Sequence, residues 1–188
     1  MKIMFMTLRD RVERFTDFNA LPKDWEYVWA GYEKNIEKLL EMGGDADAIL
    51  ADAIAPVPGD LIEAMPNLKI IHSEGVGYEG VDLAAADRKH VYVCNNRGAN
   101  KRAVAEQTVM LMLMVLRRAA LGHQKVLEGQ QIEAKAGWSM EGIPELGSMH
   151  VGIIGMGDIG IETAKLLNAF GCKVSYNKRY PLSPGLEE

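Results

Sequence analysis

The stretch from His150 to Arg179 constrains the fold of this chain more than any other part of its 188 residues. A short apolar run leads into the segment 155–160, which reads G-M-G-D-I-G, and apolar residues at helical spacing then continue to Phe170. Gly171 ends this helical pattern, and a second apolar run ends at Asn177. The order of strand, G-x-G-x-x-G turn, helix and strand is that of the unit that binds the pyrophosphate of a dinucleotide.

The glycines of this segment have separate physical roles. Gly155 permits the tight turn out of the strand, Gly157 lets the backbone approach phosphates, and Gly160 lets the helix pack closely on the strand. The backbone N–H groups of Asp158 and Ile159 at the helix start attract an anion together with the helix dipole. We expect the Asp158 carboxylate to point away from the phosphates. The alternative is a glycine-rich turn in another kind of α/β protein, but the flanking elements favour dinucleotide binding.

The end of the second strand indicates the type of dinucleotide. An acidic residue at this position would bind the ribose 2′-hydroxyl and repel a 2′-phosphate. This chain instead has Asn177, Lys178 and Arg179. Asn177 can hydrogen-bond a hydroxyl, and the two cations can pair with a phosphate. We therefore predict that NADP(H) is preferred over NAD(H), the alternative being that both cations are ordinary solvated charges.

Composition excludes several classes of protein. The net charge of −5 argues against non-specific nucleic-acid binding. The longest apolar run, Val109 to Leu116, is much shorter than a membrane span, and no signal peptide is recognisable. Cys94 and Cys172 lack metal-type spacing, so we predict no metal site and reduced thiols in a cytoplasmic protein.

The first hundred residues alternate between strand and helix patterns. Alternation at this spacing predicts a parallel sheet covered on both faces. The predicted strands are 2–7, 24–30, 46–51, 68–72 and 91–94, and the predicted helices are 11–18, 33–42, 56–65 and 82–88.

This alternation stops near Asn100, where we place a domain boundary. The pattern over 100–121 predicts one long connecting helix, apolar nearly all round and buried between two bodies, or alternatively a core helix of one domain. Residues 122–137 are predicted to be irregular to helical, and 138–149 to form a loop. The predicted buried positions of the long helix are Val104, Thr108, Leu111, Val115 and Leu116.

Three runs together resemble the D-isomer-specific 2-hydroxyacid dehydrogenases, which include phosphoglycerate, glyoxylate and hydroxypyruvate enzymes. The first run is Gly75 to Asp82, which reads G-V-G-Y-E-G-V-D. The second is Asn95 to Asn100 followed by Val104 to Thr108, and the third is Val151 to Gly160. Their order and spacing match the family from about Leu68 to the end of the sequence.

The resemblance implies an α/β fold in which a flavodoxin-like substrate domain (1–100) precedes the start of a Rossmann domain (101–188). It further implies that the turn at Gly75, Val76 and Gly77 holds the substrate carboxylate through backbone N–H groups, which is chemically sensible. Val104 and Thr108 would then contact the nicotinamide. The alternative for Gly75 and Gly77 is an ordinary tight turn, and we expect Glu106 to have a structural role.

The family's catalytic Arg, Glu and His have no counterpart in this sequence, so no catalytic residue is assigned. His72, His90, His123 and His150 are not convincing substitutes. One strand–helix–strand unit cannot bury its own apolar faces, so we expect a truncated Rossmann domain, with a homodimer as one way to cover the open sheet. Arg97 stands where the family often has proline, and it either attracts an acidic substrate or points to solvent.

Three functional hypotheses remain. The first is a portion of an NAD(P)-dependent oxidoreductase that reduces a 2-oxoacid to a D-2-hydroxyacid and is inactive alone. The second is a non-catalytic module that binds a nucleotide or a protein. The third, a response-regulator-like domain, is disfavoured because no pair of Asp residues follows the first strand; Asp10 stands there alone.

Overall fold

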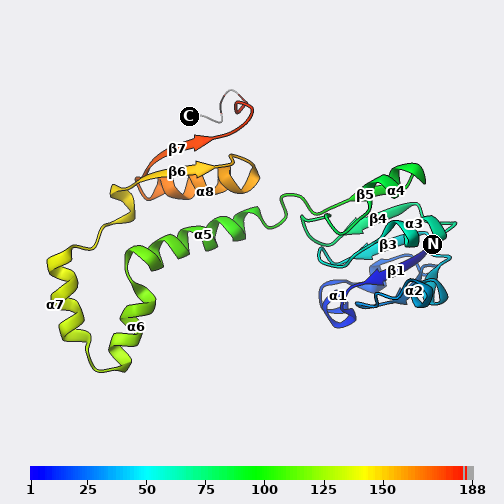
Figure 1. Cartoon of the computed structure of the whole chain (residues 1–188), viewed down its shortest axis with the longest axis horizontal. Coiled ribbons are helices and arrows are strands. Elements are labelled where there is room, and N and C mark those ends of the chain that lie inside the picture. Colours follow the sequence, from blue (N-terminus) through cyan, green and yellow to red (C-terminus); the bar gives the residue numbers. More distant parts are fainter. Residues whose placement is uncertain (184, 186–188) are drawn as a thin grey trace. The chain divides into compact units, whose positions relative to one another are not determined.

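The computed structural model describes residues 1–183 and 185. The chain divides into two compact units, Met1–Arg97 and Gly98–Glu188, both visible in Figure 1. The sequence placed its domain boundary near Asn100, three residues from this division. We describe the two units separately, as unit 1 and unit 2.

Unit 1 is built on a five-stranded parallel sheet with strand order β2-β1-β3-β4-β5. This order is that of flavodoxin-like folds, and it confirms the predicted fold class of this part of the chain. The strands are β1 (Lys2–Met6), β2 (Glu26–Trp29), β3 (Ala48–Ala51), β4 (Ile70–Ser73) and β5 (Tyr92–Cys94). The helices are α1 (Arg9–Phe15), the 3-10 turn η1 (Phe18–Ala20), α2 (Ile36–Gly43), α3 (Gly59–Ala64) and α4 (Leu83–Arg88).

The helix predicted over 56–65 begins only at Gly59. Val57 forms a parallel bridge with Val81, so the chain before Pro58 is extended and pairs with another segment. Pro58 is the N-cap residue, in an extended conformation. The proline thus stands just before the helix and not inside it.

The core of unit 1 lies on one face of its sheet. Met4, Ile49 and Ile71 are paired across β1, β3 and β4, and all three are fully or almost fully buried. Leu39 of α2 and Leu61 of α3 pack into the same cluster. The apolar strands and the apolar helix faces therefore bury one another, as expected for helices that cover a parallel sheet.

Unit 2 begins with three helices and ends with a strand–helix–strand unit. The bounds are α5 (Lys101–Leu116), α6 (Ala119–Leu127), α7 (Gln131–Glu141), the 3-10 turn η2 (Leu146–Ser148), β6 (His150–Ile154), α8 (Asp158–Ala169) and β7 (Lys173–Asn177). Strands β6 and β7 are parallel and pair from His150 with Lys173 to Ile154 with Asn177. The predicted opening of a Rossmann domain is therefore present.

The prediction of one helix over 100–121 is wrong. Helix α5 ends at Leu116, Arg118 adopts a left-handed conformation (φ 52°), and α6 begins at Ala119. Neither glycine nor proline marks this break in the sequence. The Arg118 guanidinium forms an ion pair with Glu141 at 2.6 Å and lies 5.6 Å from the Trp138 ring centroid, so tertiary contacts with α7 accompany the break.

The prediction of a loop over 138–149 is wrong in its first part. Residues 138–141 form the last turn of α7, and the loop begins only at Gly142, which has a positive φ of 80°. Gly142 ends the helix, whereas the predicted loop began at Trp138. Glycine tolerates the left-handed backbone that is common at helix ends.

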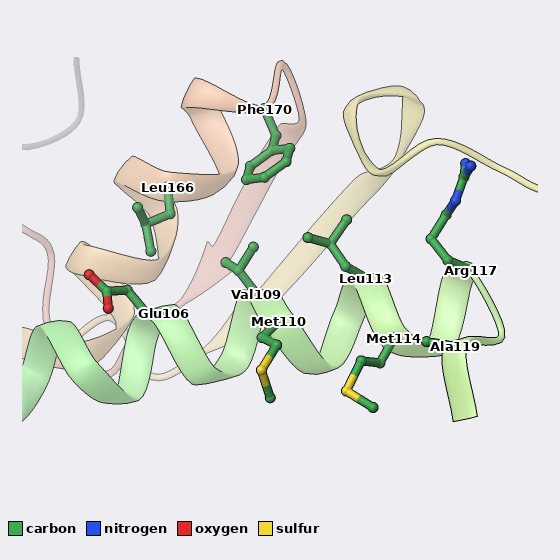
Figure 2. A pocket seen from close by; sticks show the side chains of 9 residues that line it. All are labelled: Glu106, Val109, Met110, Leu113, Met114, Arg117, Ala119, Leu166 and Phe170. Atoms are coloured by element: carbon green, nitrogen blue, oxygen red, sulfur yellow. The ribbon is translucent and has the colours of Figure 1, made fainter. Parts of the chain in front are cut away.

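Two of the positions predicted to be buried in the long helix are exposed. Leu111 is 50% and Val115 is 76% exposed, whereas Ala105 and Val109 are the buried residues of α5. Figure 2 shows that Val109 and Leu113 lie on the side of α5 that faces Leu166 and Phe170, whereas Met110 and Met114 point away. Helix α5 packs on α8 along one side only. In the described part of the chain, no helix is both long and apolar enough to cross a membrane.

Candidate functional site

The glycine turn of unit 2 leaves room for phosphates where side chains would block it. Gly155 has a φ of 96°, and its N–H donates to the carbonyl of Asn177 at 2.9 Å, which ties the turn to the end of β7. A Cβ on Gly160 would lie 2.4 Å from the Gly155 carbonyl oxygen, so only glycine fits there. No atom lies within 4 Å of the Cβ position of Gly157, so a ligand can approach its backbone.

The first turn of α8 begins beside these glycines. The N-cap residue is Gly157, and no side-chain cap hydrogen bond is formed. The dipole of α8 favours an anion in front of the first N–H groups of the helix, those of Asp158 and Ile159. The Asp158 carboxylate lies 3.9 Å from the Cβ position of Gly98, beside the segment that leads into α5. The residues present fit a dinucleotide pyrophosphate.

The other predicted cofactor residues of unit 2 lie at two places. Asn177, Lys178 and Arg179 are exposed at the end of β7, and the Arg179 guanidinium stacks 5.5 Å from the Tyr180 ring centroid. Val104 and Thr108 are half-buried on α5, where the Thr108 hydroxyl donates to the Val104 carbonyl at 2.8 Å. The groove lined by Thr108 includes residues 150–152 of β6 and not the glycine turn.

A second turn, residues 74–77 of unit 1, follows β4. All four of its carbonyl oxygens accept hydrogen bonds, three of them from the two residues that follow the neighbouring strand β5. The donors are Asn96 Nδ2 to Glu74 (2.8 Å), Asn96 N to Gly75 (2.9 Å), Asn95 Nδ2 to Val76 (2.7 Å) and Ser73 Oγ to Gly77 (2.6 Å).

Two backbone N–H groups of this second turn are not used in hydrogen bonds within the described part of the chain. The N–H groups of Val76 and Gly77 donate to no other residue in the described part of the chain. A Cβ on Gly75 would lie 2.6 Å from the Cβ of Ala53, and one on Gly77 would lie 2.7 Å from Glu79 Oε2, so the turn is closely packed. Fixed carbonyls and open amides form a concavity that suits a carboxylate.

The sequence motif contained Asn95 and Asn96, but we assigned no role to them or to Ser73. A signal was available. Carboxyl ends of adjacent parallel strands meet at one edge of a sheet, so polar residues directly after β5 lie next to the turn after β4. Only the tertiary structure shows that these side chains bond to the turn's carbonyls.

Arg11, Asp52 and Glu74 form a charged cluster next to this turn. The sequence analysis did not predict this cluster. The Arg11 Nη2 atom donates to Asp52 Oδ2 at 2.7 Å and also contacts Glu74 Oε2. The hydrogen bond to Asp52, together with the interaction with Glu74, raises the pKa of Arg11. Burial opposes ionisation of Asp52, but hydrogen bonds from Tyr32, the Ile54 amide and Arg11 outweigh it and hold the pKa of that carboxyl below its usual value.

Of the histidines, His72 lines the groove that Arg11 and Glu74 also line, and His150 lies on β6. His150 Nε2 lies 2.6 Å from Ser175 Oγ, on the exposed face of the β6–β7 pair. Within residues 1–183 and 185, no group of three or more His, Cys, Asp or Glu side chains could hold a metal ion.

These features define a class of protein: an α/β protein with a flavodoxin-like unit, the start of a Rossmann unit and a glycine-containing turn after a strand in each. The model of the D-isomer specific 2-hydroxyacid dehydrogenase catalytic domain matches residues 7–179, and the chain belongs to that family. The predicted family is thereby confirmed.

Relatives with assigned names agree with this family. The chain is 35% identical over 140 residues to a glyoxylate reductase of Thermofilum pendens, covering 74% of this chain and 41% of that one. It is 36% identical over 138 residues to a hydroxypyruvate reductase of Thermotoga maritima, covering 73% and 44%. The chain thus spans less than half the length of these two relatives.

Solved structures show the same fold. The crystal structure of a glyoxylate reductase from Paecilomyes thermophila superposes with a TM-score of 0.78 at 26% identity, covering 100% of this chain and 58% of the other. An NAD-dependent formate dehydrogenase from Staphylococcus aureus, in complex with NAD, gives a TM-score of 0.75 at 28% identity, covering 94% and 56%.

Proposed function

We propose that this chain supplies the substrate-carboxylate site and the first part of the dinucleotide site for reduction of a 2-oxoacid to a D-2-hydroxyacid. The observation that carries the proposal is the turn at residues 74–77, whose carbonyls are all bonded while the Val76 and Gly77 amides are open. Relatives named glyoxylate reductase and hydroxypyruvate reductase support the same substrate class.

Ligand titration by NMR tests the substrate site directly. Oxalate, a non-reacting dicarboxylate of similar size to a 2-oxoacid, should shift the Val76 and Gly77 amide resonances, because charged acceptors bond open N–H groups most strongly. Neutral acetamide is the control and should leave both resonances in place. If oxalate moves neither amide, the proposed substrate site is wrong.

The cofactor in this proposal is held by the glycine turn of unit 2, residues 155–160. Gly155, Gly157 and Gly160 give the pyrophosphate access, the amides of Asp158 and Ile159 bind it, and Val104 and Thr108 are the proposed nicotinamide contacts. When bound, the nicotinamide would supply the hydride. The chain's own residues bind and orient the ligands. We propose that the 188 residues alone bind without turnover, because the family's catalytic Arg, Glu and His have no counterpart in this sequence.

A chimera separates the oxidoreductase from a non-catalytic binding module. The chain would be joined to the C-terminal half of the Thermotoga maritima relative, and oxidation of NADPH would be followed with glyoxylate or hydroxypyruvate. Turnover by the chimera supports the oxidoreductase. A folded chimera that binds both ligands and remains inert supports the binding module.

We further propose that NADP(H) is preferred over NAD(H). Lys178 and Arg179 are exposed where the 2′-phosphate would lie, and no acidic residue follows β7 directly. Arg179→Glu should weaken NADPH binding about tenfold and affect NADH little, because charged hydrogen bonds contribute about 1.5–3 kcal/mol. Lys173→Gln, at the opposite end of β7, is the control, and calorimetry is the measurement. Tighter binding of NADH by the unmodified chain would refute this preference.

We also propose a homodimer formed through unit 2. No residue of α6 or α7 is buried, and apolar side chains with high exposure line the helices of this unit. They include Val115 (76%), Val126 (60%), Leu127 (75%), Ile132 (68%) and Met140 (90%). Figure 2 shows a further apolar groove of about 450 Å³ beside α5, where Met110 and Met114 point away from α8. Exposed apolar surface of this extent is typical of a protein interface.

Sedimentation equilibrium tests the dimer. Leu127→Glu places a charge on the exposed surface of α6 and should convert dimer to monomer, since a desolvated charge is costly at an interface. Leu83→Glu on α4 of unit 1 is the control and should leave the dimer intact. A monomeric unmodified chain contradicts the proposal.

A cytoplasmic location completes the proposal. Cys94 is exposed and Cys172 is buried, and neither forms a disulfide. Unpaired thiols are typical of reducing compartments. Thiol labelling in intact cells should find Cys94 reduced.

A further inference from the structure

Five polar residues meet beside the turn at residues 74–77, at the carboxyl edge of the unit 1 sheet. They are Thr7, Arg11, Tyr32, Asp52 and Glu74. Arg11 Nη2 donates to Thr7 Oγ1 (2.7 Å) and Asp52 Oδ2 (2.7 Å) and contacts Glu74 Oε2. Thr7 Oγ1 donates to Glu74 Oε2 (2.7 Å), and the Tyr32 hydroxyl donates to Asp52 Oδ2 (2.6 Å).

Carboxylates lie around the turn: Glu79 Oε2 is beside Gly77, and Asp52 and Glu74 line the groove that reaches Gly75. Glu74 directly precedes Gly75, and a groove of about 450 Å³ is lined by Arg11, Asp52, Glu74 and Gly75 among other residues. The side chains of Asp52 and Glu74 are 11% and 23% exposed, so water screens their charges only in part. An anion at the Val76 and Gly77 amides would therefore be repelled by both carboxylates.

Arg11 is the group that offsets this repulsion. One guanidinium charge (+1) and two carboxylate charges (−2) leave the cluster with −1, and without Arg11 the cluster would carry −2. Arg11 forms an ion pair with each of the two carboxylates. The side chain of Arg11 is 43% exposed and lies on the wall of the groove.

We infer that Arg11 is a positioning residue that makes the turn at residues 74–77 acceptable to an anion, by neutralising Asp52 and Glu74. This inference rests on the proposed substrate site. A purely mechanical role, in which Arg11 only ties the segments after β3 and β4 together, is the competing explanation.

The two explanations differ in what a second substitution does. Arg11→Gln changes the cluster charge from −1 to −2, Glu74→Gln changes it to 0, and the double variant returns it to −1. If charge decides, oxalate affinity should fall about three- to tenfold in R11Q, rise by a similar factor in E74Q, and recover to the unmodified value in R11Q/E74Q. If Arg11 acts only by holding the two segments together, the double variant should bind oxalate no better than R11Q.

The measurement is oxalate titration of the 188-residue chain, followed at the Val76 and Gly77 amides in low and high salt. The loss in R11Q should shrink as salt increases, because salt screens charge and leaves mechanical ties unaffected. Arg14→Gln is the matched control, since Arg14 lies on the same helix, stacks on Phe15 and forms no ion pair with a described residue. Arg14→Gln should leave oxalate affinity unchanged.

The outcomes separate this inference from the proposed function. If oxalate leaves the amides of the unmodified chain unshifted, the substrate site fails and the role of Arg11 fails with it. If the unmodified chain binds and R11Q binds equally well, only the role of Arg11 is overturned. If R11Q does not fold, E74Q still tests the inference. Unchanged oxalate affinity in E74Q would by itself overturn the proposed role of Arg11.

Discussion

Two turns in this chain are the proposed anion sites, and they are built by opposite means. In unit 2 the turn at residues 155–160 relies on missing side chains and on the uncapped start of α8. In unit 1 the turn at residues 74–77 has no helix behind it, and hydrogen bonds from Ser73, Asn95 and Asn96 hold its carbonyls.

The two turns differ in what aligns their backbone amides. A helix start aligns its amides by itself, so glycine spacing is enough to produce the site. A free turn has no such alignment, and each carbonyl must be bonded from outside before the amides point in one direction. Added side chains should therefore act by steric exclusion in both turns, and loss of side-chain hydrogen bonds should matter only in the turn of unit 1.

The largest effect is expected for Gly160→Ala in unit 2. The new Cβ would lie 2.4 Å from the backbone carbonyl oxygen of Gly155, and backbone cannot move aside as a side chain can. Overpacking of about 1–3 kcal/mol should weaken NADPH binding about ten- to hundredfold. Fluorescence titration of NADPH is the measurement.

Gly137→Ala is the matched control for this substitution. Gly137 lies inside α7, and apart from the adjoining backbone of its own helix no described atom lies within 4 Å of its Cβ position. Alanine should therefore leave NADPH affinity unchanged and stabilise the helix by up to about 1 kcal/mol. Unchanged NADPH affinity in Gly160→Ala would show that the unit 2 turn does not depend on excluded side chains.

The same difference explains which parts of the site were predictable. The strand–helix alternation and the glycine spacing around Gly155 follow from local chemistry, and the sequence predicted both correctly. The bonds from Asn95 and Asn96 to the turn cross about twenty positions in sequence and depend on β5 pairing beside β4. No local pattern encodes them.

The break at Arg118 was unpredictable for a related reason. The segment from 100 to 121 contains helix-forming residues without proline or glycine, so local propensity favours one helix. The left-handed backbone of Arg118 coincides with an ion pair and a ring contact to α7, both with residues at least twenty positions away in sequence. Leu111 and Val115 are exposed because α5 packs on α8 along one side. The apolar composition of the segment does not show which side that is.

A smaller effect is expected for Gly75→Ala in unit 1. The new Cβ would lie 2.6 Å from the Cβ of Ala53, so the clash is between two side-chain atoms and can be removed. Gly75→Ala should weaken oxalate binding about tenfold, and Ala53→Gly in the same chain should restore most of it. NMR titration measures both. A double variant as weak as Gly75→Ala would mean that Gly75 acts through its backbone conformation and not through this contact.

The smallest effect is expected for Asn95→Ala. This change removes one of the four bonds that hold the turn, the 2.7 Å bond from Asn95 Nδ2 to the Val76 carbonyl. A hydrogen bond contributes about 0.5–1.5 kcal/mol net, so oxalate affinity should fall about threefold while the fold persists. Asn67→Ala removes a bond of the same kind, from Asn67 Nδ2 to the Asp45 carbonyl, at a distance from the turn and should not change oxalate affinity. Equal losses in the two variants would mean that general loosening of unit 1, and not the held carbonyl of Val76, decides whether the amides can bind.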